Sequence, residues 1–414
     1  MSPGVSKVRY TDIARAATYG DDTQLHELLT DMRNNQPVAL IETDDHRPFW
    51  ALSKHADILE VERQHTLFIN APRAVLMNAE AEEALKASGM AIRSLVQMDD
   101  PDHSKFRDLT RDWFMPQNLA KVEARVEAIA AEFIDKLLAT GGECDFVNDI
   151  AVWYPLRVIM MILGVPEKDE ALMLKLTQEL FGADDPDLQR QGVTKEERMQ
   201  TIMQFFTYFT EITAQRRANP TDDVSSVIAN AKIDGQAIGE IDAMSYYIIV
   251  ATAGHDTTSS STAGGLLALI QNPEQMAKLR ANPKLLPSAV DEAIRWVTPV
   301  KHFMRTATVD YLLNGQEIKA GESVMMMYAS ANRDEDVFDG PFEFRVDRRP
   351  NRHLAFGNGA HHCLGHLLAK MEMKALYKQL LEKTSDIQLA GDPAWVQSVF
   401  VSGLKTLPIR FTPA

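Results

Sequence analysis

The chain has 414 residues and a formal net charge of −15. Nucleic acids attract basic surfaces, so this acidic balance argues against a nucleic-acid-binding protein. Apolar residues make up 45% of the sequence, an ordinary share for a globular protein with a large core. The length fits either two or three domains or a single large enzyme domain.

Neither a targeting segment nor a membrane span is predicted. Residues 1–6 contain no apolar stretch of the signal-peptide type. The longest apolar run, around Tyr246 to Gly254, is interrupted by Thr252 and stays short of the about 18 residues that suggest a membrane span. The two cysteines, Cys144 and Cys363, imply no disulfide framework. We therefore expect a cytoplasmic protein that makes no membrane contact, with Cys144 as a structural core thiol.

The first hundred residues predict helix, then a hairpin, then an irregular region. Residues 1–36 show amphipathic helical spacing, and residues 37–41 and 49–52 read as two short strands joined by a polar turn. Residues 66–100 mix loop and short-helix signals and are rich in apolar side chains. This region is either ordinary core or a loop that covers an apolar ligand, because methionines adapt well to apolar surfaces.

The middle of the chain is predicted to be helical. A helix opens at Asp100 and stops before Pro116, and four longer helical segments follow near 117–139, 149–163, 168–183 and 195–218. The polar break at 182–194 is either a lid hinge or a plain surface loop.

A further helix is predicted from about Glu240 to Ile270. It would be roughly 45 Å long. Between Ile248 and Ala253 it is apolar nearly all round, so we expect it to be buried. The C-terminal third then predicts a helix at 286–297, a strand after Thr298, a hairpin turning at Asn314-Gly315 and another strand at 324–328.

The predicted central helix contains Ala253-Gly254-His255-Asp256-Thr257-Thr258, a run unfavourable in a buried helix. Glycine lowers helix stability, a buried aspartate needs a partner, and threonine can bond back to an earlier carbonyl. Such local conflicts are typical of functional sites. The run is either a kinked structural helix or a site where Gly254 makes room for a small ligand beside the acid Asp256 and the alcohol Thr257.

The stretch from Phe356 to Gly365 combines glycines with a cysteine. Gly357 and Gly359 allow a tight turn close to a flat ligand. Cys363 precedes an apolar helical pattern, and a thiolate at a helix start is stabilised by unpaired N–H groups and is a good ligand for a redox metal. A zinc site is the alternative, but its candidate ligands lack the usual paired spacing: His361, His362, Cys363 and His366.

Two spaced pairs and one basic cluster complete the candidate residues. His103 and Arg107 share a helix face, as do Glu292 and Arg295. Either pair could be an ordinary salt-bridge or surface feature. A basic cluster is either a solvated face or a docking surface for an acidic electron donor; it comprises Arg345, Arg348, Arg349, Arg352, Lys370, Lys374 and Lys378.

The four motifs H-x-x-x-R, A-G-x-D-T, E-x-x-R and F-G-x-G-x-H-x-C-x-G occur in this order, and together they resemble the cytochrome P450 family over about residues 35–412. Two further runs, 253–261 and 351–354, are similar to the bacterial subgroup that hydroxylates terpineol. The resemblance implies a mainly α fold with a smaller β region (α+β). In it, the haem lies between the long central helix and the cysteine loop.

The resemblance also assigns roles to individual residues. It implies a haem b whose axial ligand is the Cys363 thiolate, with Phe356 and Gly357 in the ligand loop and Gly254 beside the haem. Asp256 and Thr257 would deliver protons during dioxygen reduction. The propionate partners would be His103, Arg107, Arg305 and His361, and the residues that steady the loop would be Glu292, Arg295 and Arg348.

The implied reaction inserts one oxygen atom from O₂ into a C–H bond. The sequence shows neither a dinucleotide loop nor an iron–sulfur cysteine set, so the resemblance implies a separate [2Fe–2S] ferredoxin and its NAD(P)H-dependent reductase. A haem-thiolate sensor or carrier without oxygen activation is the alternative function.

The candidate pocket residues are all apolar, which favours a small hydrophobic substrate such as a monoterpene, a terpenoid alcohol or an alkylbenzene. They are Met77, Leu95, Val96, Met98, Val250, Ala253, Val300, Phe303 and Phe400. We expect one domain over residues 1–414, with a β-rich part at about 37–53 and 304–328 and a helical part at about 100–297 and 363–384.

Overall fold

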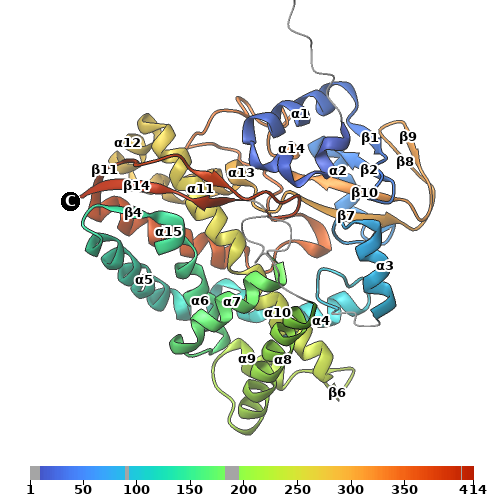
Figure 1. Cartoon of the computed structure of the whole chain (residues 1–414), viewed down its shortest axis with the longest axis horizontal. Helices are drawn as coiled ribbons and strands as arrows, with labels where there is room; N and C mark the ends of the chain where they lie inside the picture. The colour runs from blue at the N-terminus through green and yellow to red at the C-terminus, as the bar shows by residue number, and fades with distance from the viewer. Residues whose placement is uncertain (1–9, 89–92, 182–194, 402) are drawn as a thin grey trace, which may run out of the picture.

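A computed structural model describes residues 10–88, 93–181, 195–401 and 403–414. Helices make up most of the molecule, and the largest sheet lies to one side with α1, α2 and α14 (Figure 1). The helices are α1 Asp22–Asn35, α2 His55–Arg63, α3 Ala79–Ser88, α4 Asp102–Arg111, α5 Pro116–Ala139, α6 Trp153–Leu163, α7 Glu170–Phe181, α8 Lys195–Ala218, α9 Val224–Ala229, α10 Glu240–Ala253, α11 Asp256–Gln271, α12 Pro273–Ala281, α13 Leu286–Val297, α14 Tyr328–Ala331 and α15 His366–Lys383.

The largest sheet joins two distant parts of the chain. Its strand order is β1-β2-β10-β7-β3, and only the β2–β10 pair is parallel. The strands are β1 Val38–Ile41, β2 Phe49–Leu52, β3 Phe68–Ile69, β7 His302–Ala307 and β10 Ser323–Met327. The predicted hairpin of β1 and β2 is confirmed, and residues 38–69 and 302–327 share one sheet.

The remaining strands are short. A three-stranded sheet has the order β11-β14-β4, and three two-stranded pairs are β5–β6, β8–β9 and β12–β13. Their bounds are β4 Glu143–Asp145, β5 Lys232–Ile233, β6 Gln236–Ala237, β8 Tyr311–Leu313, β9 Gln316–Ile318, β11 Thr384–Leu389, β12 Ala394–Trp395, β13 Leu404–Thr406 and β14 Pro408–Pro413. Asn314 (φ 47°) and Gly315 (φ 78°) turn the β8–β9 hairpin, as the two positive φ values of a type I′ turn require.

The predicted central helix is divided in two. α10 ends at Ala253 and α11 begins at Asp256, so the expectation of one unbroken helix was wrong. The Thr257 hydroxyl donates to the carbonyl of Ala253 at 2.9 Å, and the ring of His255 is bound to the carbonyl of Val152. Side-chain bonds of this kind bend helices. The break therefore lies within the run that carries the candidate acid and alcohol.

Three hydrophobic clusters of the described residues support the structure, and the third packs the sheet against α2 with Leu52, Ile58 and Val61. The larger core lies among the helices and includes side chains of α5, α6, α10, α11, α13 and α15. A smaller core packs α1 against the sheet, with Met304, Met325 and Met327 at its centre. Cys144 is half-buried in β4 rather than deep in the core, and burial still raises the pKa of its thiol to about 12. The predicted hinge or loop at 182–194 lies outside the described residues.

Candidate functional site

A cavity lies between the α10–α11 break and the loop that precedes α15. Its volume is about 250 Å³, at the small end of ligand sites, which usually measure about 300–1,000 Å³. The chain thus contains a pocket of ligand-binding size between these two elements.

The loop before α15 turns tightly because of its two glycines. Gly357 and Gly359 have φ values of 66° and 70°, in the left-handed region, which glycine adopts without strain. A Cβ atom on Gly359 would lie 2.6 Å from the backbone oxygen of Glu62 in α2. The glycines thus allow the loop to approach α2 closely, a neighbour that sequence patterns did not identify.

Cys363 lies in the cavity wall at the end of this loop. Its backbone N–H donates to the carbonyl of Phe356 at 2.9 Å. Burial raises the pKa of the thiol, while the backbone N–H groups of Gly365 and His366 and the charge of Arg107 act in the opposite direction. Such donors favour a thiolate at the start of a helix. The donors around the sulfur thus oppose the effect of burial, although burial outweighs them and the pKa of the free thiol is raised.

Four cationic or potentially cationic side chains converge on the same cavity: His103, Arg107, Arg305 and His361. The rings of His103 and His361 are 3.9 Å apart between centroids. Burial and the nearby charges of Arg305, His103 and Arg107 lower the pKa of His361 to about 2. The two arginines thus supply the charge, and the neutral imidazole of His361 can supply a hydrogen bond to an anionic group.

Arg107 also connects α4 to the cysteine loop. Its Nη2 atom donates to the carbonyl of His362 at 2.6 Å, one residue before the cysteine. Arg305 is 3% exposed and donates to the carbonyl of Met304. Both guanidinium groups are therefore held in place by backbone oxygens.

The acid and the alcohol of the α10–α11 break occupy different positions. Thr257 lines the cavity, whereas Asp256 lies beside it with its side chain 35% exposed. Gly254 also lines the cavity, and a Cβ atom there would lie 2.9 Å from Cδ1 of Ile159 in α6. A glycine at position 254 is therefore explained by its close packing against α6 as well as by the expected space for a ligand.

Glu292, Arg295 and Arg348 form a buried charge network. The Glu292 side chain is fully buried, accepts two bonds of 2.8 Å from Arg295 and accepts from Arg348 at 3.0 Å. Both arginines donate in addition to the carbonyl of Glu343. The network joins α13 to the segment that leads into the cysteine loop.

Six of the nine candidate pocket residues line the cavity: Leu95, Val96, Val250, Ala253, Val300 and Phe303. Met98 packs in the larger core instead, and Met77 is half-buried outside the lining. Phe400 lies behind the wall, with its ring 5.4 Å from that of Phe303. The lining also contains Phe114, Ile159, Tyr246, Ile249, Ile294 and Tyr328, which the sequence did not single out.

Two buried carboxyl groups also line the cavity and were missed. Glu62 receives a hydrogen bond from the Tyr328 hydroxyl at 2.7 Å, and its second oxygen has no partner. Glu372 in α15 has one buried oxygen without a partner, and burial raises the pKa of its carboxyl group well above the usual range. Helical spacing could have identified both, because Glu62 follows Ile58 by four positions and Glu372 follows Leu368 by four.

Glu62 is expected to make stability depend on pH. Burial raises its pKa to about 7, so between about pH 4.5 and 7 the folded protein binds a proton that the unfolded chain releases. Stability from a raised pKa is lost as pH rises, and a shift of this size corresponds to about 3 kcal/mol. Urea unfolding of wild type should show this decline, and Glu62→Gln should flatten it; an unchanged slope in the variant would exclude Glu62 as its source.

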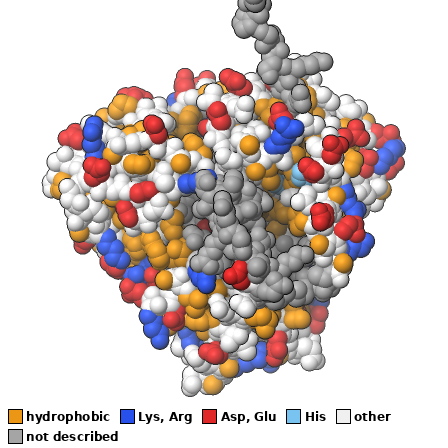
Figure 2. Space-filling model, in the orientation of Figure 1, with side chains coloured by type: hydrophobic (Ala, Val, Ile, Leu, Met, Phe, Trp, Pro, Cys, Tyr) orange, Lys and Arg blue, Asp and Glu red, His pale blue; other side chains and the backbone are white. Residues whose placement is uncertain are grey.

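The basic cluster is not a single exposed surface. Arg348 is buried in the Glu292 network, so its inclusion in a docking surface was wrong. Lys370, Lys374 and Lys378 each lie within ion-pair distance of an acid on α13 or α5. Figure 2 shows basic and acidic side chains interspersed over one face of the molecule. Arg349 and Arg352 remain exposed beside the cysteine loop.

Comparison with known proteins identifies the class. The family model for cytochrome P450 matches residues 77–385, and the chain belongs to this family. It is 46% identical over 408 residues to cytochrome P450-terp of a Pseudomonas species, covering 96% of this chain and 95% of the relative. It is 34% identical to steroid C26-monooxygenase of Mycobacterium tuberculosis, covering 92% and 99% of the two chains.

A solved structure confirms the fold. The crystal structure of CYP108D1 from Novosphingobium aromaticivorans superposes with a TM-score of 0.92 at 43% identity, over 100% of both chains. The predicted cytochrome P450 fold, mainly helical with a smaller sheet region, is therefore confirmed, and the chain is an oxidoreductase of the monooxygenase type. No helix within the described ranges is long and apolar enough to cross a membrane.

The cavity fits the haem-thiolate group that the family implies. One wall presents the Cys363 sulfur with its N–H donors, and the buried Arg305 and half-buried Arg107, with paired imidazoles, suit two carboxylates. The zinc alternative gains no support, because the described part of the chain contains no group of three or more His, Cys, Asp or Glu side chains arranged for a metal ion.

Proposed function

We propose that the chain is a single-domain, cytoplasmic haem-thiolate monooxygenase that hydroxylates a small hydrophobic substrate. The observation that carries this proposal is the convergence of the Cys363 thiol and the Thr257 hydroxyl on one apolar cavity. Its electrons come one at a time from a [2Fe–2S] ferredoxin served by an NAD(P)H-dependent reductase, and its second substrate is O₂.

The chain's own residues hold and orient the cofactor. Cys363 would hold the iron of haem b through its sulfur, and the N–H groups of Gly365 and His366 favour the thiolate against burial, which raises the pKa of the thiol. Arg107 and Arg305 would pair with the two propionates, helped by hydrogen bonds from His103 and His361. When bound, the haem supplies the activation of dioxygen, which a thiolate ligand favours.

Thr257 and Asp256 deliver the protons that dioxygen reduction consumes. The Thr257 hydroxyl donates to Ala253 at rest and can turn its proton toward the cavity. Asp256 lies next to it in the chain, and its half-exposed carboxyl group can exchange protons with solvent. The pair therefore links solvent to the cavity without opening it to bulk water.

The substrate class follows from the lining. The six pocket residues that line the cavity are apolar, and the cationic lining residues are those that would hold the propionates. A monoterpene, terpenoid alcohol or alkylbenzene fits such a wall, and the relative named cytochrome P450-terp supports the terpene class. Titration with a panel of these compounds, followed by the haem absorption spectrum, identifies those that displace water from the iron.

Thr257→Ala is the direct test of the proton pathway. We expect this variant to keep NADH oxidation but to release hydrogen peroxide instead of product, because one donor to the cavity is lost. Removing a positioned proton donor typically costs on the order of 10²–10⁴ in rate. Product formed per NADH is the measurement, and Thr262→Ala is the control because its hydroxyl makes the same bond four residues back, to Thr258. Unchanged coupling in Thr257→Ala would remove Thr257 from the pathway.

A further inference from the structure

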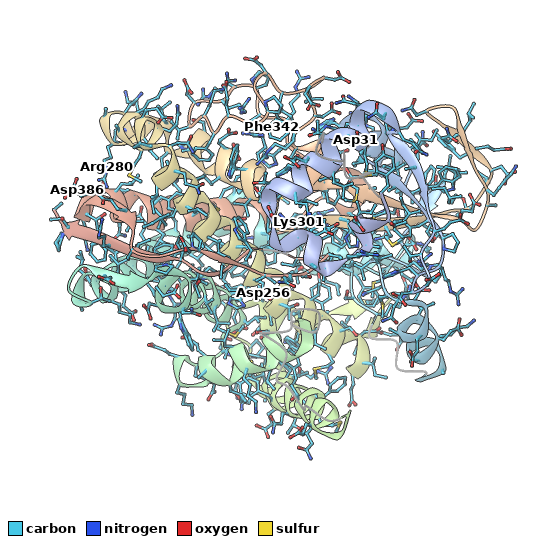
Figure 3. All side chains as sticks on the ribbon, turned by 45° about the horizontal axis from the view of Figure 1, so that its top comes forward. Asp31, Asp256, Arg280, Lys301, Phe342 and Asp386 are labelled. Atoms are coloured by element: carbon cyan, nitrogen blue, oxygen red, sulfur yellow. The ribbon has the colours of Figure 1, made fainter. Side chains whose placement is uncertain are left out.

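His255, which no motif position required, lies in the α10–α11 break and is 1% exposed. Its Nε2 atom is 2.8 Å from the carbonyl oxygen of Val152, just before α6. Its Nδ1 atom is 2.9 Å from Oδ1 of Asp256. Figure 3 labels Asp256 in the middle of the molecule, where α11 begins. The ring thus joins α6 to the candidate proton-carrying acid.

The two contacts fix where the ring protons must lie. A backbone carbonyl only accepts hydrogen bonds, so Nε2 carries a proton. Nδ1 then faces a carboxylate oxygen, and two lone pairs at this distance would repel each other. A second proton is therefore required between His255 and Asp256. The two atoms lie within ion-pair distance, although their alignment falls short of a hydrogen bond.

The surroundings agree with a charged ring. Among the described residues, Asp256 is the titratable group that acts on His255, and the other polar contact is the Val152 carbonyl of the neighbouring element. Burial lowers the pKa of this imidazole, but Asp256 and the hydrogen bond to Val152 outweigh burial, so the pKa is raised. The pair also lies at the first turn of α11, where the helix N-terminus stabilises the negative charge of Asp256.

We propose that His255 is a positioning residue for Asp256: it holds the carboxylate beside Thr257 as an imidazolium ion pair and keeps one proton in reserve for it. This inference rests on the proposed function of the site. The proton moves from Nδ1 of His255 to Oδ1 of Asp256, which leaves the neutral ring still bonded through Nε2 to Val152. Asp256, exposed on one side, takes up the replacement proton from solvent and returns it to Nδ1.

The charge of the ring can be measured without turnover. Nitrogen-15 NMR of histidine-labelled protein, in the diamagnetic ferrous carbon monoxide complex, distinguishes a doubly protonated ring from a neutral one. At pH 6.5 we expect the His255 ring to carry both protons, its signal to be absent in His255→Gln, and the ring to lose a proton at lower pH in Asp256→Asn than in wild type. A His255 ring with an unprotonated Nδ1 in wild type would overturn the proposal.

Turnover supplies the second readout. His255→Gln keeps an N–H donor near Val152 but cannot carry the positive charge. We therefore expect the product formed per NADH to fall on the order of tenfold, a smaller loss than removal of the acid Asp256 itself would cause. In wild type, coupling should decline as pH rises through the raised pKa of His255, and this dependence should vanish in the variant. If His255→Gln formed as much product per NADH as wild type, the proposal would be contradicted.

His26→Gln is the matched control, because His26 is also close to an aspartate on a helix, Asp22 at 3.6 Å, but lies on α1 away from the cavity. It should leave coupling unchanged. If the proposed function itself were wrong, the wild-type protein would show neither the red-shifted carbon monoxide band nor product. The NMR result on His255 would still decide the charge of the ring in that case.

Discussion

Cys363→Ser should abolish both the red-shifted absorption band of the reduced carbon monoxide complex and product formation. A serine hydroxyl does not ionise as a thiol does, so the variant cannot supply the electron-rich sulfur ligand. We expect activity to fall more than about a thousandfold, which corresponds to about 4 kcal/mol in the barrier. The measurements are the difference spectrum and product analysis with a reconstituted ferredoxin system.

Cys144→Ser is the control for this experiment. Cys144 is the other cysteine of the chain and is half-buried in β4. Its replacement should leave the band in place. A red-shifted band retained by Cys363→Ser, or lost in Cys144→Ser, would contradict the assignment of the ligand.

Glu292→Gln should have the largest effect on stability. The carboxylate neutralises Arg295 and Arg348 in a network that is almost fully shielded from water. Its removal leaves two buried guanidinium charges uncompensated, and breaking a buried ion pair in this way typically costs about 3–5 kcal/mol. Urea unfolding, monitored by circular dichroism, is the measurement.

A surface pair serves as the comparison. Glu123 lies 3.8 Å from Lys374, and both side chains are nearly half-exposed. Exposed pairs contribute about 0–1 kcal/mol, so Glu123→Gln should change the free energy of unfolding by less than that amount. Equal effects of the two variants would show that Glu292 does not act through its buried charge.

The sequence allowed accurate prediction wherever the signal is local. The helix at 286–297 and the Asn314-Gly315 turn match the structure, because periodicity and turn chemistry act within a few residues. Three of the four motifs also led to one cavity, although they are spread from His103 to Cys363. That step depended on family resemblance, since spacing alone cannot bring distant segments together.

The errors arose where tertiary contacts decide. The break at His255 depends on a bond to Val152, a residue in another element. The burial of Arg348 removes it from the basic cluster, although the family resemblance had already grouped it with Glu292, which is 56 positions away in the chain. Long-range partners of this kind have no signature in a single sequence.

The contact between Gly254 and Ile159 has a consequence for changing substrate preference by mutagenesis. Both residues line the cavity, and a methyl group on Gly254 would overlap the tip of Ile159. Gly254→Ala should therefore require Ile159 to shift, whereas Ile159→Val removes the contact with Cδ1 and leaves Cγ1 at 3.0 Å. Laboratory evolution should therefore accept Gly254→Ala more readily after a change in α6 than before it.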